Sequence, residues 1–444
     1  MGPRIVVICF VLLGYSGCRT NTPCPTCPSQ PVSNLTIDTI VVESVEADLH
    51  LSTKDSTRLG SISLMRNAKQ IFSGTINQKD TIFIDDSVVS SNIYTYRAYR
   101  HLSSGGSTTD SSNRLTFRTM DTTIHNFTWE IDTLGEGLNG YLKDVVVVND
   151  SCAYAVGLIR IKDSSGNWDP NQYTVGTWDG HRWEYSVGAG AGMGAVFAFS
   201  RYDVWAGTSG LYHYTGGNWI PANISAGIGG YITKIWGTSG EDLFVVGTND
   251  QIEHFDGLAW KHSNAGLGVD FTDVWGTQDG TEVWTCGWNQ TAYGTYILKY
   301  TVASGWTIVR NGTQAQNLVL PDSISGTYTG VYTDRPNCIF IGSSAGLFRA
   351  FANTTGAARR LSFTNSFFPG FPEALRGNSI NDITIVGDYA MIAHYNGATW
   401  RYFSSFRSGN QRLLAVSQRK NIVMVAGIID DPINSKGVVY IGRR

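Results

Sequence analysis

Histidine, the side chain most often used for acid–base chemistry or metal binding near neutral pH, recurs here in one kind of motif. His213 lies in HYTG, His254 in HFDG and His394 in HYNG. A metal site needs ligands that converge on one point, whereas equivalent positions of successive repeats point around a ring. We therefore interpret these histidines as residues of a structural repeat and predict no metal site.

Cysteines and carboxylates give no catalytic signature either. Cys152, Cys286 and Cys338 lie in apolar runs, where a small buried thiol is the simplest interpretation. Glu241 and Asp242 are adjacent on a turn, whereas an acid/base pair needs two carboxyl groups in different environments. No GxSxG or HExxH motif occurs in a suitable context. We predict no catalytic residue and no cofactor.

A repeat with a spacing of 40 to 55 residues organises the second part of the chain. Its second strand is an apolar run that ends in glycine, and consecutive apolar positions are typical of a strand covered on both faces. Sheets stacked radially have such strands, which predicts an all-β propeller. The seven terminal glycines are Gly157, Gly207, Gly247, Gly287, Gly342, Gly387 and Gly427.

The closing strand of most units has a tryptophan after a turn glycine, at Trp183, Trp219, Trp260, Trp306 and Trp400. The seventh unit ends at Arg444, one strand short, and HNFTWEID (His125–Asp132) resembles the missing strand. We predict seven blades, with Phe127–Ile131 pairing onto the strand near Ile441. Such closure removes the open sheet edges.

These repeats resemble the WGTSG, VVG and YDGxxW repeats of many bacterial propellers, over about Ile124–Arg444. The resemblance implies the fold and says almost nothing about activity. Kelch glycine doublets, WD40 signatures and the sialidase box are absent from the expected places.

Long loops on one face hold the candidate ligand-binding residues. The loop after the second strand is expanded in units one, four and seven, and it shares a face with the long connections between units. Loops on a rigid scaffold often bind ligands, and aromatic rings beside amides stack on sugars or anchor proteins. Packing of the loops against one another is the alternative. The candidates are Trp168, Asp169, Tyr173, Trp288, Asn289, Tyr293, Phe367, Phe368, Phe371 and Arg407.

Residues 1–17 have the layout of a signal peptide, with a basic residue, the apolar run Ile5–Leu13 and GYSG before Cys18. The apolar run is too short to span a bilayer. Ser16, Gly17 and Cys18 resemble a bacterial lipobox, although Tyr15 replaces its usual aliphatic residue. The resemblance implies lipidation of Cys18, with plain secretion as the alternative. It also implies an outer-membrane anchor, because Arg19 is not the aspartate of the inner-membrane retention rule.

Residues 18–32 are proline-rich and predict an extended tether. Cys24 and Cys27 form a CxxC that lacks the second pair or packed scaffold of a zinc or redox site. A spacer with an incidental disulfide is therefore the favoured interpretation.

Residues 33–122 alternate strand-like segments with polar turns, which predicts a β-sandwich. The segment NIYTYRAY, the glycine-rich loop after it and RLTFRT resemble the last two strands of a fibronectin type III domain. That resemblance gives Tyr94 or Tyr96 the role of the tyrosine corner. Another sandwich of similar size is the alternative, because all thirteen tryptophans lie at or beyond Trp129. The propeller is therefore assigned to residues 123–444.

The composition excludes a nucleic-acid footprint, since the 444 residues have a net charge of only -3. We expect a non-enzymatic, monomeric, membrane-anchored protein of the cell envelope. Its loop-rich propeller face would bind a protein or a glycan. The alternative is a carbohydrate-active enzyme, a hydrolase or lyase, which would need two carboxylates about 5 to 10 Å apart in the central pocket.

Overall fold

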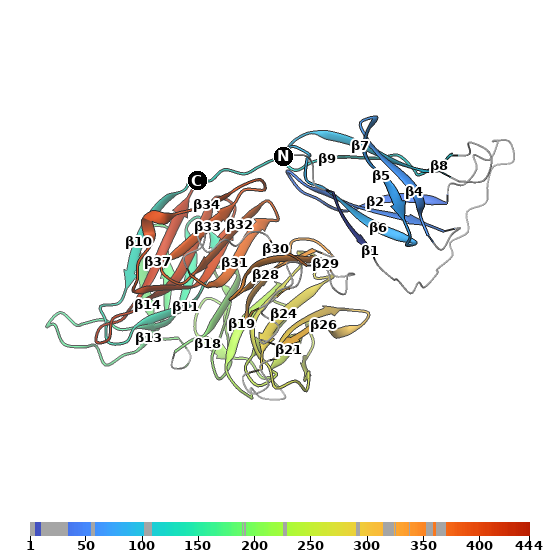
Figure 1. Cartoon of the computed structure of the whole chain (residues 1–444). Helices are drawn as coiled ribbons and strands as arrows, with labels where there is room; N and C mark the ends of the chain where they lie inside the picture. The colour runs from blue at the N-terminus through green and yellow to red at the C-terminus, as the bar shows by residue number, and fades with distance from the viewer. Residues whose placement is uncertain are drawn as a thin grey trace. The chain divides into compact units, whose positions relative to one another are not determined.

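The structure is a computed structural model that describes residues 5–9, 34–54, 58–101, 109–188, 190, 192–224, 229–289, 294–313, 324, 326–336, 338–351, 358–360 and 370–444. Its regular elements within these ranges are β-strands and one short 3-10 helix, η2 (Ser404–Phe406). No helix of the described residues is long and apolar enough to cross a membrane. The chain divides into two compact units, Met1–Thr123 and Ile124–Arg444 (Figure 1).

The first unit is a sandwich of two antiparallel sheets. One sheet has the order β1-β6-β3-β2, and the other has the order β5-β4-β7-β8 with β9 also paired to β7. The strands of the first sheet are β1 (Ile5–Cys9), β2 (Leu35–Val42), β3 (Ala47–Thr53) and β6 (Asp80–Asp85). Those of the second are β4 (Gly60–Arg66), β5 (Lys69–Ile76), β7 (Ile93–His101), β8 (Thr109–Ser111) and β9 (Leu115–Arg118).

Alternate residues of these strands face one shared core, as the period of two requires. Leu35 and Ile37 of β2 and Tyr96 and Ala98 of β7 are all fully buried in it. β1 lies within the segment predicted to be a signal peptide, and it pairs with β6. The signal peptide itself stays a prediction.

Two tyrosines of β7 bind the turn between β6 and β7. The backbone N–H of Val89 donates to the hydroxyl oxygen of Tyr94 over 2.9 Å. The hydroxyl of Tyr96 donates to the carboxylate of Asp85 over 2.8 Å. Burial, followed by the charge of Asp85, raises the pKa of Tyr96 well above its usual value. β7 is thereby tied to the start of the turn before it.

The described part of the second unit contains seven four-stranded antiparallel sheets, here numbered in chain order. Sheet 1 has β11 (Tyr141–Asn149), β12 (Cys152–Ile159), β13 (Tyr173–Trp178) and β14 (Trp183–Ser186); sheet 2 has β15 (Ala195–Ser200), β16 (Asp203–Gly207), β17 (Leu211–Tyr214) and β18 (Trp219–Pro221). Sheet 3 has β19 (Ile232–Ser239), β20 (Asp242–Gly247), β21 (Ile252–Phe255) and β22 (Trp260–Ser263); sheet 4 has β23 (Asp270–Gly276), β24 (Val283–Trp288), β25 (Gly294–Thr301) and β26 (Gly305–Thr313). Sheet 5 has β27 (Tyr328–Tyr332), β28 (Cys338–Ser343), β29 (Gly346–Phe351) and β30 (Ala358–Arg360); sheet 6 has β31 (Pro372–Ser379), β32 (Asp382–Gly387), β33 (Met391–Tyr395) and β34 (Trp400–Tyr402). Sheet 7 has β35 (Gln411–Arg419), β36 (Ile422–Ile429), β37 (Lys436–Arg443) and β10 (Thr128–Leu134).

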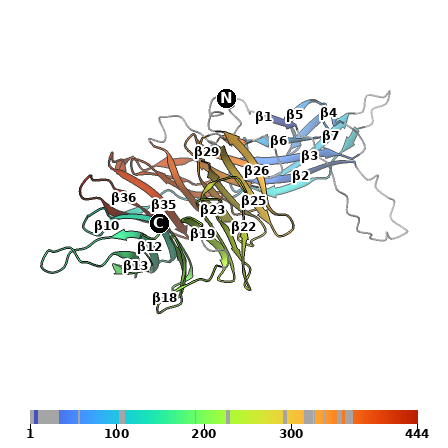
Figure 2. The same cartoon turned by 90° about the horizontal axis from the view of Figure 1, so that it is seen from below.

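The first strands of the sheets form an inner ring. Each contacts the first strand of the following sheet, and β35 contacts β11. Figure 2 shows β19, β23 and β35 toward the middle of this unit, with β18 and β10 at its edge. Radially arranged four-stranded sheets around a centre define a β-propeller, as the repeats predict.

Sheet 7 combines the two ends of the propeller sequence. β10 pairs with β37 in antiparallel register, and Ile131 is opposite Tyr440. The predicted pairing of Phe127–Ile131 with the C-terminal strand is thus confirmed, with the strand shifted slightly toward Leu134. This pairing covers the edge that β37 would otherwise expose.

The apolar runs are the second strands of the sheets and are covered on both faces. In β20, Leu243 and Val245 pack with sheet 2, whereas Phe244 and Val246 pack with sheet 4. Each sheet therefore needs both neighbours to bury its apolar residues, as expected for a strand without polar alternation.

Candidate functional site

A cavity of about 530 Å³ lies at the centre of the ring, where the first strands begin. This is the face that holds the loops after the second strands and the connections between sheets. Strand residues of six sheets line it, together with residues that flank the strands of sheet 2. Its lining residues are Tyr141, Lys143, Gly192, Gly194, Thr208, Tyr231, Ile232, Thr233, Lys234, Thr272, Asp273, Thr329, Glu373, Ala374 and Leu414.

β-bulges in six of the seven sheets each aim one side chain into this cavity. Six of the first strands have a register shift near their start, and each shift leaves one extra residue unpaired with the second strand. An extra residue of this kind is re-aimed by the local bend of the strand. The six extra residues all line the cavity: Lys143, Thr233, Thr272, Thr329, Glu373 and Leu414.

The glycines that end the apolar runs accommodate these bulges. A Cβ on Gly157 would lie 2.1 Å from the carbonyl oxygen of Tyr141, and one on Gly387 would lie 1.9 Å from that of Phe371. Gly247, Gly287 and Gly427 meet the same obstacle. A side chain there would displace the bulged strand, so the repeated glycine marks the position of a cavity residue on the neighbouring strand.

Three threonines of the bulge series link consecutive sheets. The hydroxyls of Thr233, Thr272 and Thr329 donate to backbone carbonyl oxygens at the start of the next first strand, over 2.6, 3.0 and 2.8 Å. Their hydrogen-bonding capacity is thus used inside the scaffold. The charged members of the series are Lys143 and Glu373.

Lys143 and Glu373 differ in their environments. Lys143 is exposed, and its ammonium group lies 5.6 Å from the ring centroid of Tyr141. Glu373 is partly buried, and burial, followed by the negative charge of Asp388, raises the pKa of its carboxyl. No described residue forms an ion pair with Glu373. A cation brought to this carboxyl would stabilise its ionised form.

A smaller cavity of about 120 Å³ is lined in part by Asp144, Lys234 and Arg376, which form buried ion pairs. Lys234 lies 2.6 Å from Asp144. Arg376 binds both carboxylate oxygens of Asp273, over 2.5 and 2.9 Å, and its guanidinium lies 4.3 Å from the ring centroid of Trp275. Both carboxylates also accept backbone N–H groups. They are saturated by structural partners and give no free acid/base pair beside Glu373.

The predicted residues of the first long loop hold the loop itself. The hydroxyl of Tyr173 donates to Asp169 over 2.9 Å, and the backbone N–H of Asn171 donates to the same carboxylate. The ammonium of Lys162 lies 5.1 Å from the ring centroid of Trp168, and these two residues form a β-bridge. The loop is therefore an ordered hairpin extension with a half-exposed tryptophan.

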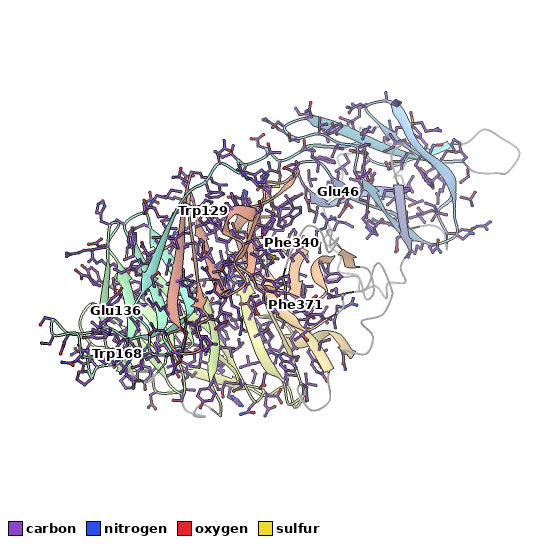
Figure 3. The ribbon with its side chains drawn as sticks, turned by 60° about the vertical axis from the view of Figure 1, so that its left-hand side comes forward. Glu46, Trp129, Glu136, Trp168, Phe340 and Phe371 are labelled. Atoms are coloured by element: carbon purple, nitrogen blue, oxygen red, sulfur yellow. The ribbon has the colours of Figure 1, made fainter. Side chains whose placement is uncertain are left out.

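The other predicted residues are dispersed. Asn289 is buried, and its amide donates to the carbonyl oxygen of Leu267 over 2.6 Å. Trp288 is half-buried, Phe371 is 58% exposed, and Arg407 is exposed after η2. Figure 3 shows Trp168 beside Glu136 at one edge of the propeller and Phe371 well away from it. Tyr293, Phe367 and Phe368 lie outside the described residues.

The three repeat histidines each bind an aspartate of their own sheet, in keeping with a structural role. His213 pairs with Asp203 over 2.8 Å, His254 with Asp242 over 2.9 Å and His394 with Asp382 over 2.7 Å. No cluster of three metal-ligating side chains occurs among the residues that the structure describes. Cys152, Cys286 and Cys338 are all buried.

Comparisons with known proteins identify the fold. No protein-family model matches the chain, and no curated protein sequence matches it. A solved structure described as YCF48 bound to D1 peptide is similar with a TM-score of 0.51 and 10% sequence identity, covering 73% of this chain and 99% of that chain. The computationally designed Ika8 protein matches with a TM-score of 0.45 and 14% identity, over 69% of this chain and 98% of its own. The similarity to YCF48 supports the β-propeller fold.

Proposed function

We propose that this chain is a non-enzymatic binding or scaffold protein of the cell envelope, which holds a protein partner at the central cavity of its propeller. The observation that carries this proposal is the set of bulge residues in that cavity. They place the amine of Lys143 and the partly buried carboxyl of Glu373 on a rigid ring whose other charged lining residues, Lys234 and Asp273, are held in ion pairs. Residues on rigid strands are well suited to recognition.

A polypeptide fits this chemistry better than a glycan does. A cavity with one amine and one carboxyl outside the structural ion pairs complements a protein segment with side chains of both charges. Tyr141 and Tyr231 at the rim supply aromatic surface, which is enriched in protein interfaces. The structure of YCF48 bound to D1 peptide provides a precedent for peptide binding by a protein of this fold.

The proposal includes the finer architecture. The propeller has seven blades, closed by β10, and the pairing of β10 with β37 together with the ring of first strands supports this count. The N-terminal unit is fibronectin type III-like, supported by the sheet orders β6-β3-β2 and β5-β4-β7-β9 and by the bond from Val89 to Tyr94. In this arrangement Tyr94 is the tyrosine of the corner.

The anchor is a lipid on Cys18, followed by the tether of residues 18–32 and located at the outer membrane. Cys18, Cys24 and Cys27 lie outside the described residues, so the support is the lipobox-like sequence. Acyl chains contribute about 0.8 kcal/mol per buried methylene, enough for stable attachment when several are present. Mass spectrometry of the mature N-terminus should find acylated Cys18, and an unmodified N-terminus elsewhere would contradict the anchor.

A photo-crosslinking experiment tests the binding site. A photoreactive amino acid replaces Leu414 in the full-length protein in its native membrane, and the expected result is a discrete crosslinked protein band. The double variant Lys143→Glu/Glu373→Lys should lose that band, while Lys261→Glu, in the exposed strand β22, should retain it. A band that survives the charge reversal, or a crosslink to glycan alone, would contradict the proposal.

A further inference from the structure

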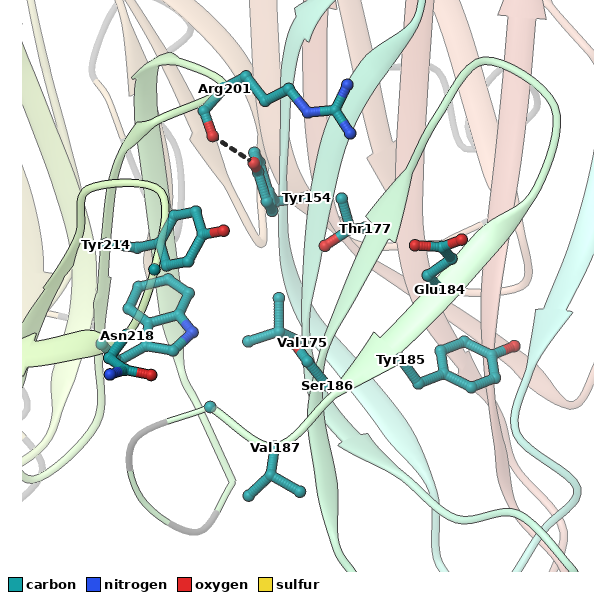
Figure 4. A pocket seen from close by; sticks show the side chains of 13 residues that line it. Tyr154, Val175, Thr177, Glu184, Tyr185, Ser186, Val187, Arg201, Tyr214 and Asn218 are labelled. Carbon is teal, nitrogen blue, oxygen red and sulfur yellow. Dashed lines mark hydrogen bonds between the residues drawn. The ribbon is translucent and has the colours of Figure 1, made fainter.

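A second cavity, separate from the central one, lies between the outer halves of sheets 1 and 2. Its volume is about 520 Å³ (Figure 4). Sheet 1 contributes Val175, Thr177 and Glu184, and sheet 2 contributes Tyr214 and Trp219. We call this cavity the lateral groove. Figure 4 shows Thr177 and Glu184 facing Tyr214 and Asn218 across open space, with Arg201 at one end.

A comparison of the sheets explains why the lateral groove is open. Near the start of each second strand, one residue that faces the next sheet is directly paired with a residue of the third strand. We call this pair the cross-strand row of the sheet. In sheets 2 to 6 the third-strand member is basic in every case. The rows are Tyr154/Thr177, Trp205/His213, Phe244/His254, Trp284/Lys299, Phe340/Arg349, Thr384/His394 and Met424/Ile441.

The basic side chains fill the space beside their own sheet. The rings of His213 and Trp205 stack with centroids 4.0 Å apart, and those of His254 and Phe244 do the same. In sheet 4, the ammonium of Lys299 lies 5.4 Å from the ring centroid of Trp284 and 2.8 Å from Glu282. In sheets 2 to 4 the filling group is thus a nitrogen base that lies on an aromatic ring and pairs with a carboxylate.

Sheet 1 lacks this group. Thr177 occupies the third-strand position, and Cys152 occupies the place that Asp203 and Asp242 hold in sheets 2 and 3. The phenol of Tyr154 instead donates to the backbone carbonyl oxygen of Arg201 over 2.7 Å. The small Thr177 leaves the space vacant, and it becomes the floor of the lateral groove.

The lateral groove retains the other two components of the filled sites. Trp219 and Tyr214 provide an aromatic wall, with ring centroids 5.4 Å apart. Glu184, opposite Thr177 on β14, provides a carboxylate. Its present partner is Arg182 at 2.9 Å, and both side chains are more than 60% exposed, so this ion pair is weak and exchangeable.

We propose that the lateral groove binds a lysine or arginine side chain presented by an extended segment of a second protein. The aliphatic part of the bound side chain lies between Thr177 and Trp219, and its cation pairs with Glu184. The second protein thus supplies the group that Lys299 supplies in sheet 4, where it lies on Trp284 and pairs with Glu282. The guanidinium of Arg201, at the other end, receives a carbonyl or carboxylate of the same segment. This site is independent of the central cavity.

The test uses two tripeptide amides and the full-length protein. The probe is N-acetyl-Gly-Arg-Gly-amide, and its neutral match has citrulline in place of arginine. Titrations followed by tryptophan fluorescence should give a Kd on the order of 1 mM for the arginine peptide and about fivefold weaker binding for the citrulline peptide. Equal binding of the two peptides would overturn the proposal.

Variants locate the binding. Thr177→His should fill the groove and abolish binding of the arginine peptide, while Thr177→Ser should leave it unchanged. Glu184→Gln should weaken binding about fivefold. The matched control is Glu130→Gln, another exposed glutamate paired with an arginine, Arg443, at 2.9 Å, and it should have no effect. Unimpaired binding by the folded Thr177→His protein would overturn the proposal.

The same titration separates this site from the central cavity. The variant Lys143→Glu/Glu373→Lys should bind the arginine peptide as the unmodified protein does. Loss of peptide binding in that variant would assign the peptide to the central cavity and overturn the lateral groove. Loss of the crosslinked partner with unchanged peptide binding supports both sites as separate.

Discussion

Sheets 1 and 3 are built on one repeat, yet the spaces beside them differ. In sheet 3, His254 lies on the ring of Phe244 and pairs with Asp242, so the space toward sheet 4 is filled. In sheet 1, Thr177 stands beside Tyr154, and the space toward sheet 2 is a groove. The apolar runs determine the architecture, whereas one cross-strand row outside them determines whether an interface is accessible.

Replacing the basic residue of a row should destabilise the protein most where that residue is most deeply buried. His394 is fully buried and binds Asp382 over 2.7 Å and His125 over 2.8 Å. His394→Thr should lower the free energy of unfolding by about 3 kcal/mol, because it leaves a buried carboxylate with one partner fewer and a cavity. Urea unfolding measures this, with the exposed turn residue His181→Thr as control. A loss below about 0.5 kcal/mol would show that the buried basic residue of this row contributes little to stability.

Acid should weaken the same region. Burial, followed by the charges of His394, Arg401 and Arg444, lowers the pKa of His125 from 6.5 to about 4. Between these two pKa values the unfolded chain binds more protons than the folded chain does. The contribution of His125 to the free energy of unfolding is therefore fully present above pH 6.5 and is lost as the pH drops toward 4. The midpoints of urea unfolding at pH 7 and at pH 5 measure this loss of stability. His125→Asn should reduce the difference between the two midpoints, and an unchanged difference would contradict the assignment.

Removing a partly exposed basic residue from its row should open the space beside the sheet, with a moderate loss of stability. The side chain of His213 is 28% exposed and stacks on Trp205. His213→Thr should cost about 1 kcal/mol and open the space between sheets 2 and 3. Acrylamide should then quench tryptophan fluorescence more strongly than in the unmodified protein. Unchanged quenching would show that the row does not control access.

Filling the open row should have the smallest effect on stability. Thr177→His adds a ring to vacant space but finds Cys152 where other sheets have a carboxylate. We expect a change within about 0.5 kcal/mol for the single variant and a gain of about 0.5 to 1 kcal/mol for Thr177→His/Cys152→Asp. Thermal unfolding measures both, and a loss above about 2 kcal/mol would show that the groove cannot accept the ring.

The fold follows from local sequence signals because the propeller repeats them. Uninterrupted apolar runs such as LFVVG, the turn glycines and the closing tryptophans each mark one strand. The last repeat contains three strands and a spare strand precedes the first repeat, which predicts that Phe127–Ile131 pairs with the C-terminal strand, as β10 does. Binary pattern and chain connectivity were sufficient for these predictions.

The candidate sites depend on geometry that no single segment encodes. Lys143 and Glu373 are far apart in sequence, and they line one cavity because a β-bulge aims each of them at it. The terminal glycines are the sequence signal for those bulges. Asn289, in an expanded loop, instead uses its amide on the carbonyl of Leu267. Thr177 is informative only when the third strands of all sheets are aligned. The alignment shows that Thr177 occupies a position at which sheets 2 to 6 have a basic residue.

A crystal structure of the full chain soaked with N-acetyl-Gly-Arg-Gly-amide tests most directly whether the lateral groove, which lacks a basic residue at Thr177, is a binding site. We predict density for the arginine side chain between Thr177 and Trp219, with its guanidinium at hydrogen-bond distance from the carboxylate of Glu184. Density for the peptide elsewhere, or a groove filled by the chain's own Arg201 in the presence of peptide, would contradict it.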